Sequence, residues 1–395
     1  MNAHHSVFRD ESKLDINFIP NRLPHRDKER RLLNEFFSFL LKTPDKMSQR
    51  VIVTGEIGTG KTALCQRFGQ EFTLEAHKRN INLRYVHVNC REYRGKLILI
   101  LQHALTVLKP MFPQRGYGAE EILKNLLQVL DEENAYLILA LDEFDSLIDS
   151  EGSDAVYNLT RLQEMRQDKP QRISLICIMR NLDTTKRLDD SARSTLQRSV
   201  IRLQRYDKMQ LLDILNDRVN LAFEPTAVPE DVVSLTADLA QDESGNARFA
   251  IELLWRAGKY ADSEELETVV PECVRQAVSN IIPSVQRSEL TTLGLHEKLF
   301  LLAAAEVFKE NTEAYSTLTE IEKAYAVACE EYEKQPVSHT QLWTYLKPLS
   351  ALGLLKTQVS GEGSRGRQTL VYLPAVSAVE LAKELRAELE SERGQ

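Results

Sequence analysis

Apolar residues in the N-terminal half of the chain form short, nearly continuous runs, separated by stretches in which they recur every three or four positions. Strands buried on both faces of a parallel sheet show the first pattern, and amphipathic helices show the second. Strands are therefore predicted at Val51–Thr54, Leu83–Asn89, Tyr136–Leu141, Ile173–Met179 and Val200–Leu203. Because these strands alternate with helices, we expect an α/β domain with a parallel sheet covered by helices.

The strand pattern stops after this domain. From Asp207 to about Ser279 the chain shows only helical periodicity. Helix-breaking residues punctuate this region at Pro225, Pro229, Gly245 and Pro271. The pattern predicts a small helical domain. A second break near Ile282 precedes a region of ordinary domain size. The expected domains are 1–205, 206–283 and 284–395.

The last region has the element order of a winged helix. Helical periodicity over 293–308 and 317–335 precedes a third helix that starts near the N-cap residue Ser338, and a hairpin follows over 354–373. The third helix is the candidate recognition helix. Its inward positions are predicted to be Leu342, Leu346, Leu349 and Leu352. The residues expected on its other faces are His339, Gln341, Tyr345 and Lys347.

The hairpin turn GEGSRGR carries Arg365 and Arg367 among glycines, well suited to reach phosphates or a minor groove. Winged helices also bind proteins, and the region has 12 basic against 16 acidic residues from Ser284 to Gln395. The residues alone therefore leave contact with DNA and contact with protein equally open. The tail Glu380–Gln395 is expected to be a charged helix that is prone to fray.

Composition narrows the class of protein. The chain has 395 residues, of which 43% are hydrophobic and 27% charged, as in folded proteins with more than one domain. Its formal charge of -8 means that any nucleic-acid contact must come from local basic clusters. The five cysteines are widely spaced, which argues against a zinc or redox motif and favours a reducing cytosol. No export signal or membrane span is expected, so the predicted location is cytoplasmic.

The segment VIVTGEIGTGKTALCQRF joins a predicted strand to a predicted helix through a glycine-rich loop. Glycines let the backbone N–H groups turn toward a phosphate, while Lys61 supplies a positive charge and Thr62 a hydroxyl ligand for Mg²⁺. A strand, this motif and a helix in this order predict a site for ATP or ADP. The expected nucleotide-binding residues are Gly55, Glu56, Ile57, Gly58, Thr59, Gly60, Lys61, Thr62 and Ala63.

Acidic residues end another predicted strand, in the run YLILALDEFDSL. On its own such a strand end is equally a solvated turn or a helix cap. Beside the glycine-rich loop, it predicts that Asp142 holds Mg²⁺ together with Thr62, and that Glu143 orients or deprotonates the attacking water. Asn181 follows the strand at Ile173–Met179 and would position that water if this strand lies between the two motif strands. As a turn-favouring loop residue, Asn181 needs no function.

These motifs, followed by a helical domain, resemble the AAA+ ATPases over residues 15–280. Three segments carry a narrower resemblance: FRDESKLDINFIPNRLPHRDKERRLL ahead of the loop, ESGNARFAIELLWRAG, and the C-terminal region. They resemble the replication initiators of the origin-recognition-complex and cell-division-control-protein-6 type, and the resemblance extends over almost the whole chain. The resemblance implies an AAA+ P-loop parallel-sheet domain, a small helical lid and a C-terminal winged-helix domain.

The resemblance also assigns residues to the nucleotide. It places adenine between Tyr206 and a leading segment whose matching residues are Ile19, Pro20, His25 and Arg26. The alternative is that these side chains only pack against other parts of the protein and do not contact a nucleotide. Arg248 matches the sensor arginine of the lid, which contacts the γ-phosphate, and a helix-face arginine paired with a carboxylate is the alternative. For the family's arginine finger, Arg193 and Arg198 are both available, but neither falls at the expected position. A solvated turn arginine is the favoured interpretation of each.

The resemblance implies a slow ATPase switch that binds double-stranded origin DNA, helps to load the replicative helicase and works with other initiator subunits near the nucleoid. A DNA-contacting helical insertion of the family would fall within Arg91–Arg115, although the apolar interior of this segment favours a core helix. The main alternative is a nucleotide-dependent switch whose winged helix binds protein rather than DNA. A further alternative binds nucleotide without hydrolysing it, which the intact set Lys61, Asp142 and Glu143 argues against.

Overall fold

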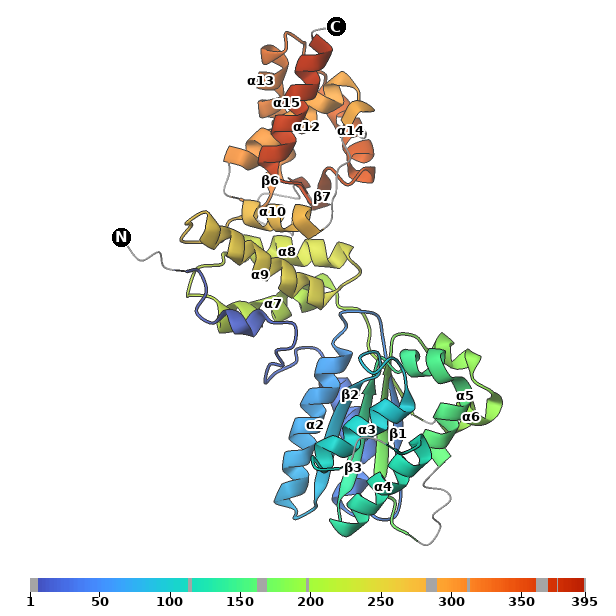
Figure 1. The fold of residues 1–395 in the computed structure, drawn as a ribbon. Helices are drawn as coiled ribbons and strands as arrows, with labels where there is room; N and C mark the ends of the chain where they lie inside the picture. Colours follow the sequence, from blue (N-terminus) through green and yellow to red (C-terminus); the bar gives the residue numbers. More distant parts are fainter. Residues whose placement is uncertain are drawn as a thin grey trace. The chain divides into compact units, whose positions relative to one another are not determined.

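The computed structural model describes residues 6–112, 116–161, 169–196, 199–281, 290–310, 313–359, 369–374 and 376–393. The chain divides into two compact units. The first is Ile19–Tyr206, and the second combines Met1–Phe18 with Asp207–Gln395. Figure 1 colours the ribbon along the sequence, so that both units can be followed.

A five-stranded parallel sheet forms the centre of the first unit. Its strands are β1 (Arg50–Thr54), β2 (Leu83–Asn89), β3 (Tyr136–Asp142), β4 (Ile173–Met179) and β5 (Val200–Arg202). They lie in the order β2-β3-β4-β1-β5, so β4 separates β1 from β3. The predicted strands and the α/β class are confirmed, with strand ends that agree to within one residue.

Helices cover both faces of this sheet (Figure 1). One face packs against α1 (Asp27–Phe37), η2 (Ser38–Leu41) and α2 (Lys61–Lys78). The other face packs against α3 (Leu97–Leu108), α4 (Ala119–Glu132), α5 (Asp145–Arg161) and α6 (Asp190–Leu196), and η3 (Leu182–Arg187) precedes α6. The apolar interior of Arg91–Arg115 becomes α3, in which Ile100, Leu101 and Leu105 are buried, so the expectation of a core helix is confirmed.

The second unit begins with a helical bundle. Its elements are η1 (Glu11–Leu14), α7 (Lys208–Ala222), α8 (Glu230–Asp242), α9 (Ala247–Ser263) and α10 (Pro271–Ile281). The predicted helix breakers mark the helix ends. Pro229 is the N-cap of α8, and Pro271 is the first residue of α10, where its missing N–H and fixed φ do not interrupt a hydrogen bond.

The N-terminal segment packs on this bundle. The Phe8 ring lies 4.7 Å from the Phe223 ring, and the backbone N–H of Val7 donates to Asp262. Phe8 packs its half-buried ring against α9 and the end of α7, so this segment lies with the second unit, although the predicted domain 1–205 included it. The boundaries near 206 and 283 stay predictions.

A winged helix follows, with the predicted order of elements. It consists of α12 (Leu295–Glu310), β6 (Ser316–Thr317), α13 (Leu318–Glu331), α14 (His339–Ala351), β7 (Lys356–Val359), β8 (Thr369–Tyr372) and α15 (Ala378–Arg393). Its antiparallel sheet has the order β6-β8-β7. The sequence pattern did not reveal β6, because two residues are too few for an alternation of apolar and polar positions to show.

The winged helix is joined to the bundle by buried polar contacts. The fully buried guanidinium of Arg275 on α10 donates to the backbone oxygen of Ala314 and pairs with Glu272. The Tyr315 hydroxyl donates to Asp238 on α8, 2.5 Å away. Charged groups are costly to bury unless they are paired in this way. These contacts therefore select one arrangement of the two parts of this unit.

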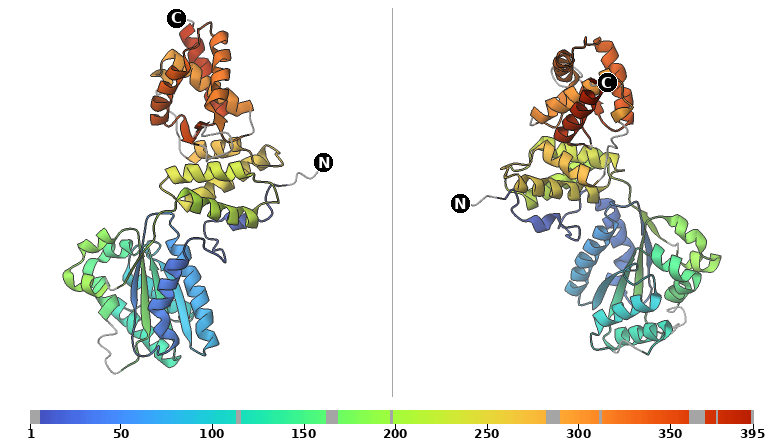
Figure 2. Two further views of the ribbon diagram at one scale, coloured as in Figure 1. Left: turned by 180° about the vertical axis from the view of Figure 1, so that it is seen from behind. Right: turned by 45° about the horizontal axis from the view of Figure 1, so that its top comes forward.

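The last helix, α15, is packed rather than frayed. Leu381, Leu385 and Leu389 are buried, and α15 runs alongside α12 in Figures 1 and 2. The Lys298 side chain of α12 is fully buried and ion-paired with Glu388 and Glu392 of α15. The high charge of the tail suggested fraying, but one apolar stripe and this ion-paired lysine hold the helix in place.

All five cysteines are buried free thiols. Within the ranges that the structure describes, no three or more His, Cys, Asp or Glu side chains gather as a metal cluster, and no helix has the length and apolar character needed to cross a membrane.

Leu385→Ala is expected to lower the free energy of unfolding of the second unit by about 3 kcal/mol, because it removes buried methyl groups and leaves a cavity against α12. Urea unfolding followed by circular dichroism measures this change. Val379→Ala on the same helix is the control, since the Val379 side chain is 47% exposed and should change stability little. Equal effects of the two substitutions would show that α15 is not packed through Leu385.

Candidate nucleotide-binding site

The glycine-rich loop leaves the sheet at the end of β1 and enters α2 at Lys61. Two glycines are required by its geometry. A Cβ on Gly55 would lie 2.7 Å from the backbone oxygen of Leu203, and Gly60 has a φ of +87° and would crowd the Tyr206 hydroxyl. The loop therefore runs so close to the neighbouring segment that side chains at these positions would displace it.

Lys61 lies over this loop. Its Nζ donates to the backbone oxygens of Gly55 at 2.7 Å and Glu56 at 2.9 Å. The ammonium group is thus held at the mouth of the loop, beside the N-terminus of α2, where the helix dipole also favours an anion. Both features suit a phosphate group, as the motif predicts.

Thr62 and Asp142 meet across the sheet edge. The Thr62 hydroxyl donates to Asp142 Oδ2 at 2.6 Å, although the two residues come from α2 and β3. A hydroxyl and a carboxylate at one point are oxygen ligands of the kind that Mg²⁺ takes, together with water and nucleotide phosphates. The donor set present therefore fits the predicted ion, and Thr62 and Asp142 would hold it.

The sequence interpretation missed His87, which contacts the same carboxylate. Its Nε2 lies 3.3 Å from Asp142 Oδ2, within ion-pair distance but without the geometry of a hydrogen bond. Gln66 Nε2 of α2 lies 3.4 Å from the other ring nitrogen. A polar residue inside the apolar strand β2 was the available signal, but only the pairing of β2 with β3 shows what it faces. His87 lies behind Asp142, where residues commonly support a metal ligand.

Asp142 is ionised more readily than an ordinary carboxyl group. Burial opposes its ionisation, but the nearby His87, the Thr62 hydroxyl and the backbone N–H of Glu143 outweigh burial, so the pKa of Asp142 is lowered. The carboxylate is therefore the form present at neutral pH, and it is the form that binds a cation.

Glu143 occupies the turn that follows β3. Its φ of +49° is unusual for a residue other than glycine, and its backbone N–H donates to Asp142 Oδ1 at 2.8 Å. The side chain is 48% exposed, and its Oε2 lies 3.8 Å from Arg91 Nη1. The turn directs the Glu143 carboxylate to solvent at the sheet edge, where a water molecule has access to it.

Asn181 follows β4, which does lie between β1 and β3 as its predicted role requires. Its side chain caps η3, accepting from the backbone N–H of Asp183 and donating to the Asp183 carboxylate. Asp145 ties this loop to α5, because it accepts from the backbone N–H of Arg180 and from the Thr184 hydroxyl. The role of Asn181 in positioning water stays a prediction.

The structure brings Arg26 and Tyr206 together beside the loop. The Arg26 guanidinium lies 3.9 Å from the Tyr206 ring centroid and donates to the backbone oxygens of Thr59 and Gln204. Both side chains are buried, and burial raises the pKa of Tyr206. Pro20 is also buried, Ile19 is half-buried, and His25 is exposed with a φ of +61°.

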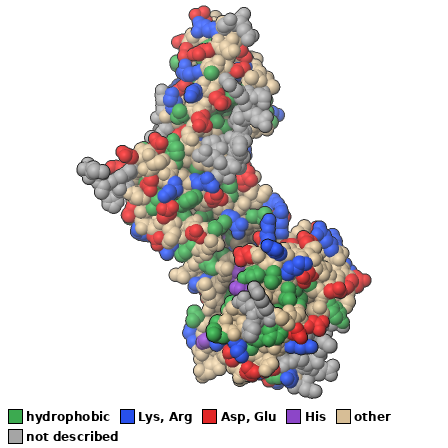
Figure 3. Space-filling view, viewed as in Figure 1, with side chains coloured by type: hydrophobic (Ala, Val, Ile, Leu, Met, Phe, Trp, Pro, Cys, Tyr) green, Lys and Arg blue, Asp and Glu red, His purple; other side chains and the backbone are tan. Residues whose placement is uncertain are grey.

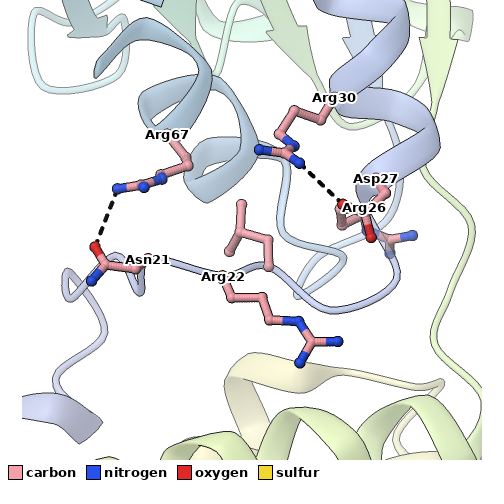
Figure 4. Close-up of a pocket in the computed structure, with 7 residues that line it drawn as sticks. Asn21, Arg22, Arg26, Asp27, Arg30 and Arg67 are labelled. Carbon is pink, nitrogen blue, oxygen red and sulfur yellow. Dashed lines mark hydrogen bonds and ion pairs between the residues drawn. The ribbon is translucent and has the colours of Figure 1, made fainter. Parts of the chain in front are cut away.

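A small cavity of about 90 Å³ lies next to this arginine (Figure 4). Its lining comes from the leading segment, α1 and α2, and consists of Asn21, Arg22, Leu23, Arg26, Asp27, Arg30 and Arg67. In Figure 4 the Arg67 side chain reaches Asn21 and the Arg30 side chain reaches Asp27. Arg30 and Arg67 also pair with Glu71, so they are held in place within the unit.

Comparison with known proteins identifies all three parts of the chain. A family model described as an AAA domain matches residues 46–188, one described as a Cdc6 AAA+ ATPase-type lid domain matches residues 212–279, and one described as a CDC6 C-terminal winged helix domain matches residues 288–380. The chain is 35% identical over 373 residues to the ORC1-type DNA replication protein 2 of Saccharolobus solfataricus, with 93% of this chain and 90% of that protein aligned. This chain belongs to the archaeal ORC1/Cdc6 family of replication initiators.

Other members of the family agree with this assignment. The ORC1-type DNA replication protein of Pyrococcus horikoshii is 30% identical over 373 residues, which cover 93% of this chain and 87% of that protein. The crystal structure of Cdc6p from Pyrobaculum aerophilum matches with a TM-score of 0.85 and 29% identity, over 98% of this chain and 100% of that chain. The structure of the Aeropyrum pernix ORC1 protein in complex with DNA matches with a TM-score of 0.63 and 27% identity, over 98% and 97%. The predicted family and fold are confirmed.

The remaining predicted site residues of this initiator are arginines on other segments of the chain. Arg248 is exposed at the start of α9, in the second unit. Arg193 is ion-paired with Asp190, three residues earlier on the same helix, α6. Arg198 lies outside the described residues, as do Arg365 and Arg367 of the hairpin turn.

The candidate recognition helix of the initiator is α14. Leu342, Leu346 and Leu349 are buried as predicted, whereas Leu352 is half-buried. Ser338 is the N-cap, although its side chain makes no capping hydrogen bond. The predicted DNA-contacting residues His339, Gln341 and Lys347 are exposed on this helix. Tyr345, expected on an outer face, packs instead against the core.

Arg26→Ala is expected to lower the free energy of unfolding of the first unit by about 2–4 kcal/mol, because hydrogen bonds from a buried cation to Thr59 and Gln204 are removed. It is also expected to weaken adenine-nucleotide binding, since the loop loses its tie to the leading segment. Thermal unfolding and titration with a fluorescent nucleotide measure both effects. Arg31→Ala, at an exposed position on α1, the helix that Arg26 precedes, is the control. Equal effects of the two substitutions would show that Arg26 has no specific role in the nucleotide-binding site.

Proposed function

We propose that this chain is an ATP-dependent replication initiator, a slow ATPase that binds duplex origin DNA and assists loading of the replicative helicase. The observation that carries the proposal is the presence, in one chain, of the Lys61, Thr62 and Asp142 constellation and a winged helix. Its relatives are named ORC1-type DNA replication proteins. Related solved structures are described as a complex with DNA and as ADPNP-ADP complexes.

Hydrolysis would use the sheet edge. Lys61 and the loop N–H groups would hold the phosphates, and Thr62 and Asp142 would hold Mg²⁺, which would supply neutralisation of developing charge. Glu143 takes a proton from the attacking water, and Asn181 orients that water. The bound nucleotide would mainly bias the conformation of the lid and of the DNA-bound protein. Such a switch needs only slow hydrolysis.

The adenine would lie beside Tyr206 and Arg26, with Ile19, Pro20 and His25 completing the slot. Arg248 would contact the γ-phosphate when the lid closes. Whether an arginine finger operates stays open, with Arg193 and Arg198 as the available residues; Arg193 pairs with Asp190 of its own helix.

The duplex would be bound by the winged helix. His339, Gln341 and Lys347 on α14 would lie at the groove, and Arg365 and Arg367 would contact phosphates from the wing. On the face shown in Figure 3, basic side chains are interspersed with acidic ones, which agrees with local rather than general attraction to DNA. The helicase and other initiator subunits are the proposed protein partners, and DNA binding would place the protein at the nucleoid.

The alternative, a winged helix that binds only protein, is not favoured. The names of the relatives refer to DNA replication, and one related structure is described as bound to DNA.

Glu143→Gln is expected to lower the rate of phosphate release by at least about a hundredfold, because it removes the general base while keeping the shape of the side chain. Nucleotide binding should remain. A phosphate-release assay with ATP, run with and without chelation of Mg²⁺, measures this effect. Glu92→Gln is the control, since Glu92 is an exposed carboxylate of the same unit. A wild-type rate in Glu143→Gln would exclude Glu143 from the chemistry.

Lys347→Ala, Arg365→Ala and Arg367→Ala are each expected to weaken duplex binding. Each should also make the log–log slope of affinity against salt shallower by about 0.9, because one phosphate of the duplex is no longer neutralised. Fluorescence anisotropy of a labelled duplex across a salt series, with ATP and with ADP, measures this. Lys383→Ala on α15 is the control for removal of one exposed charge. Absence of duplex binding in both nucleotide states would overturn the DNA-binding role.

A further inference from the structure

The exposed face of α14 carries no negative charge. The helix sequence HTQLWTYLKPLSA contains neither Asp nor Glu. The surrounding C-terminal region is acidic, with 16 acidic against 12 basic residues from Ser284 to Gln395. The exposed side chains of α14 include those of Thr340, Gln341, Trp343, Thr344 and Lys347. α14 has no carboxylate of its own, and the neighbouring Glu322 of α13 is paired with His339, so this face suits an anionic partner.

One large apolar side chain lies on this face. The Trp343 side chain is 43% exposed, although it is the largest aromatic residue of the helix. Exposed tryptophans are energetically unfavourable in isolation, and they are enriched where partners bind.

Trp343 is held by a chain of two hydrogen bonds. Its indole Nε1–H donates to His339 Nε2 at 3.0 Å, and His339 Nδ1 lies 2.7 Å from Glu322 Oε2 on α13. An indole N–H can only donate, so Nε2 of His339 must accept and carries no proton. The proton is therefore on Nδ1 and is donated to Glu322. His339 thus connects a carboxylate on α13 to a tryptophan on α14.

These hydrogen bonds determine which part of the Trp343 side chain is available to a binding partner. The N–H group is the only polar group of the indole, and it is occupied by His339. The remaining exposed surface is the apolar ring. The ring orientation is set in advance, which lowers the entropy cost of binding.

We propose that Trp343 contacts the C5-methyl groups of thymines in the major groove, and that His339 and Glu322 are positioning residues that hold its ring. This inference rests on the proposed function, in which α14 binds duplex DNA. Among the base edges in the major groove, the thymine methyl is the apolar group, whereas the others present hydrogen-bond donors and acceptors. An indole whose N–H is occupied cannot read those groups, but it contacts a methyl well. His339 therefore acts through Trp343 rather than reading a base itself.

The test uses a pair of duplexes that differ only in methyl groups. A duplex selected by the full-length protein from a random-sequence pool is synthesised with thymine and again with uracil in place of every thymine. The wild-type protein is expected to bind the thymine duplex about fourfold more tightly for each methyl that the ring contacts. Trp343→Ala is expected to bind both duplexes equally. Val379→Ala, which truncates another exposed apolar side chain of the winged helix, should keep the preference.

Two further variants test the positioning role. His339→Leu cannot accept from the indole, so the preference for thymine should fall toward that of Trp343→Ala. His339→Gln retains an acceptor and a donor, so it should restore part of the preference. A fall in affinity that is equal for both duplexes in His339→Leu would mean that His339 contributes only to packing or contacts DNA directly, and would overturn its positioning role.

Fluorescence reports on the ring itself. The chain has two tryptophans, so Trp255→Phe leaves Trp343 as the sole tryptophan emitter. Addition of the selected duplex is expected to quench or shift its emission in parallel with the anisotropy of the labelled duplex. Duplex binding with unchanged emission and no preference between thymine and uracil would overturn this inference and leave the proposed function standing. Failure to bind any duplex would overturn both.

Discussion

The contact between Thr62 and Asp142 depends on the whole of the first unit. Thr62 lies in the first turn of α2, which follows β1, and Asp142 ends β3. The two meet because β1 and β3 end at the same edge of the parallel sheet, on either side of β4. Parallel strands end at the same edge, so each motif is brought to that edge by backbone pairing rather than by its own side chains. Burial of apolar residues on both faces of the sheet holds this pairing in one register.

Around this contact, interactions of different kinds restrict the geometry. Close backbone approach at Gly55 sets the path of the loop, and the buried Arg26 ties the loop to the leading segment. Asp145 ties the strand end at β4 to α5. His87 lies against the carboxylate from a third strand. Small displacements of any of these groups would move the oxygen ligands apart, so the loop, the acidic turn and the following loop act as one site.

The second unit uses buried charge in a comparable way. Arg275 and Lys298 are both fully buried. Arg275 pairs with Glu272 of its own helix and donates to the distant Ala314 backbone oxygen, and Lys298 pairs with Glu388 and Glu392 of α15. Removing one partner would leave an uncompensated charge, so these pairs favour one packing over alternatives. On α14 the chain from Glu322 through His339 to Trp343 uses the same principle at the surface, where hydrogen bonds fix the orientation of an exposed ring.

Strands, the order of helices, the phosphate loop and the acidic turn could all be predicted from local patterns. They depend on the spacing of apolar residues and on glycines, both of which act over a few residues. Membership in the initiator family followed from the same segments. The packing of residues 6–18 on the second unit and of the charged tail on α12 was not predicted, because each packs against a surface that sequence periodicity does not reveal. The contacts of His87 with Asp142 and of His339 with Trp343 were decided only by tertiary structure. A polar residue inside a strand or on a helix face shows no partner in the sequence, since the partner arrives from another element when the chain packs.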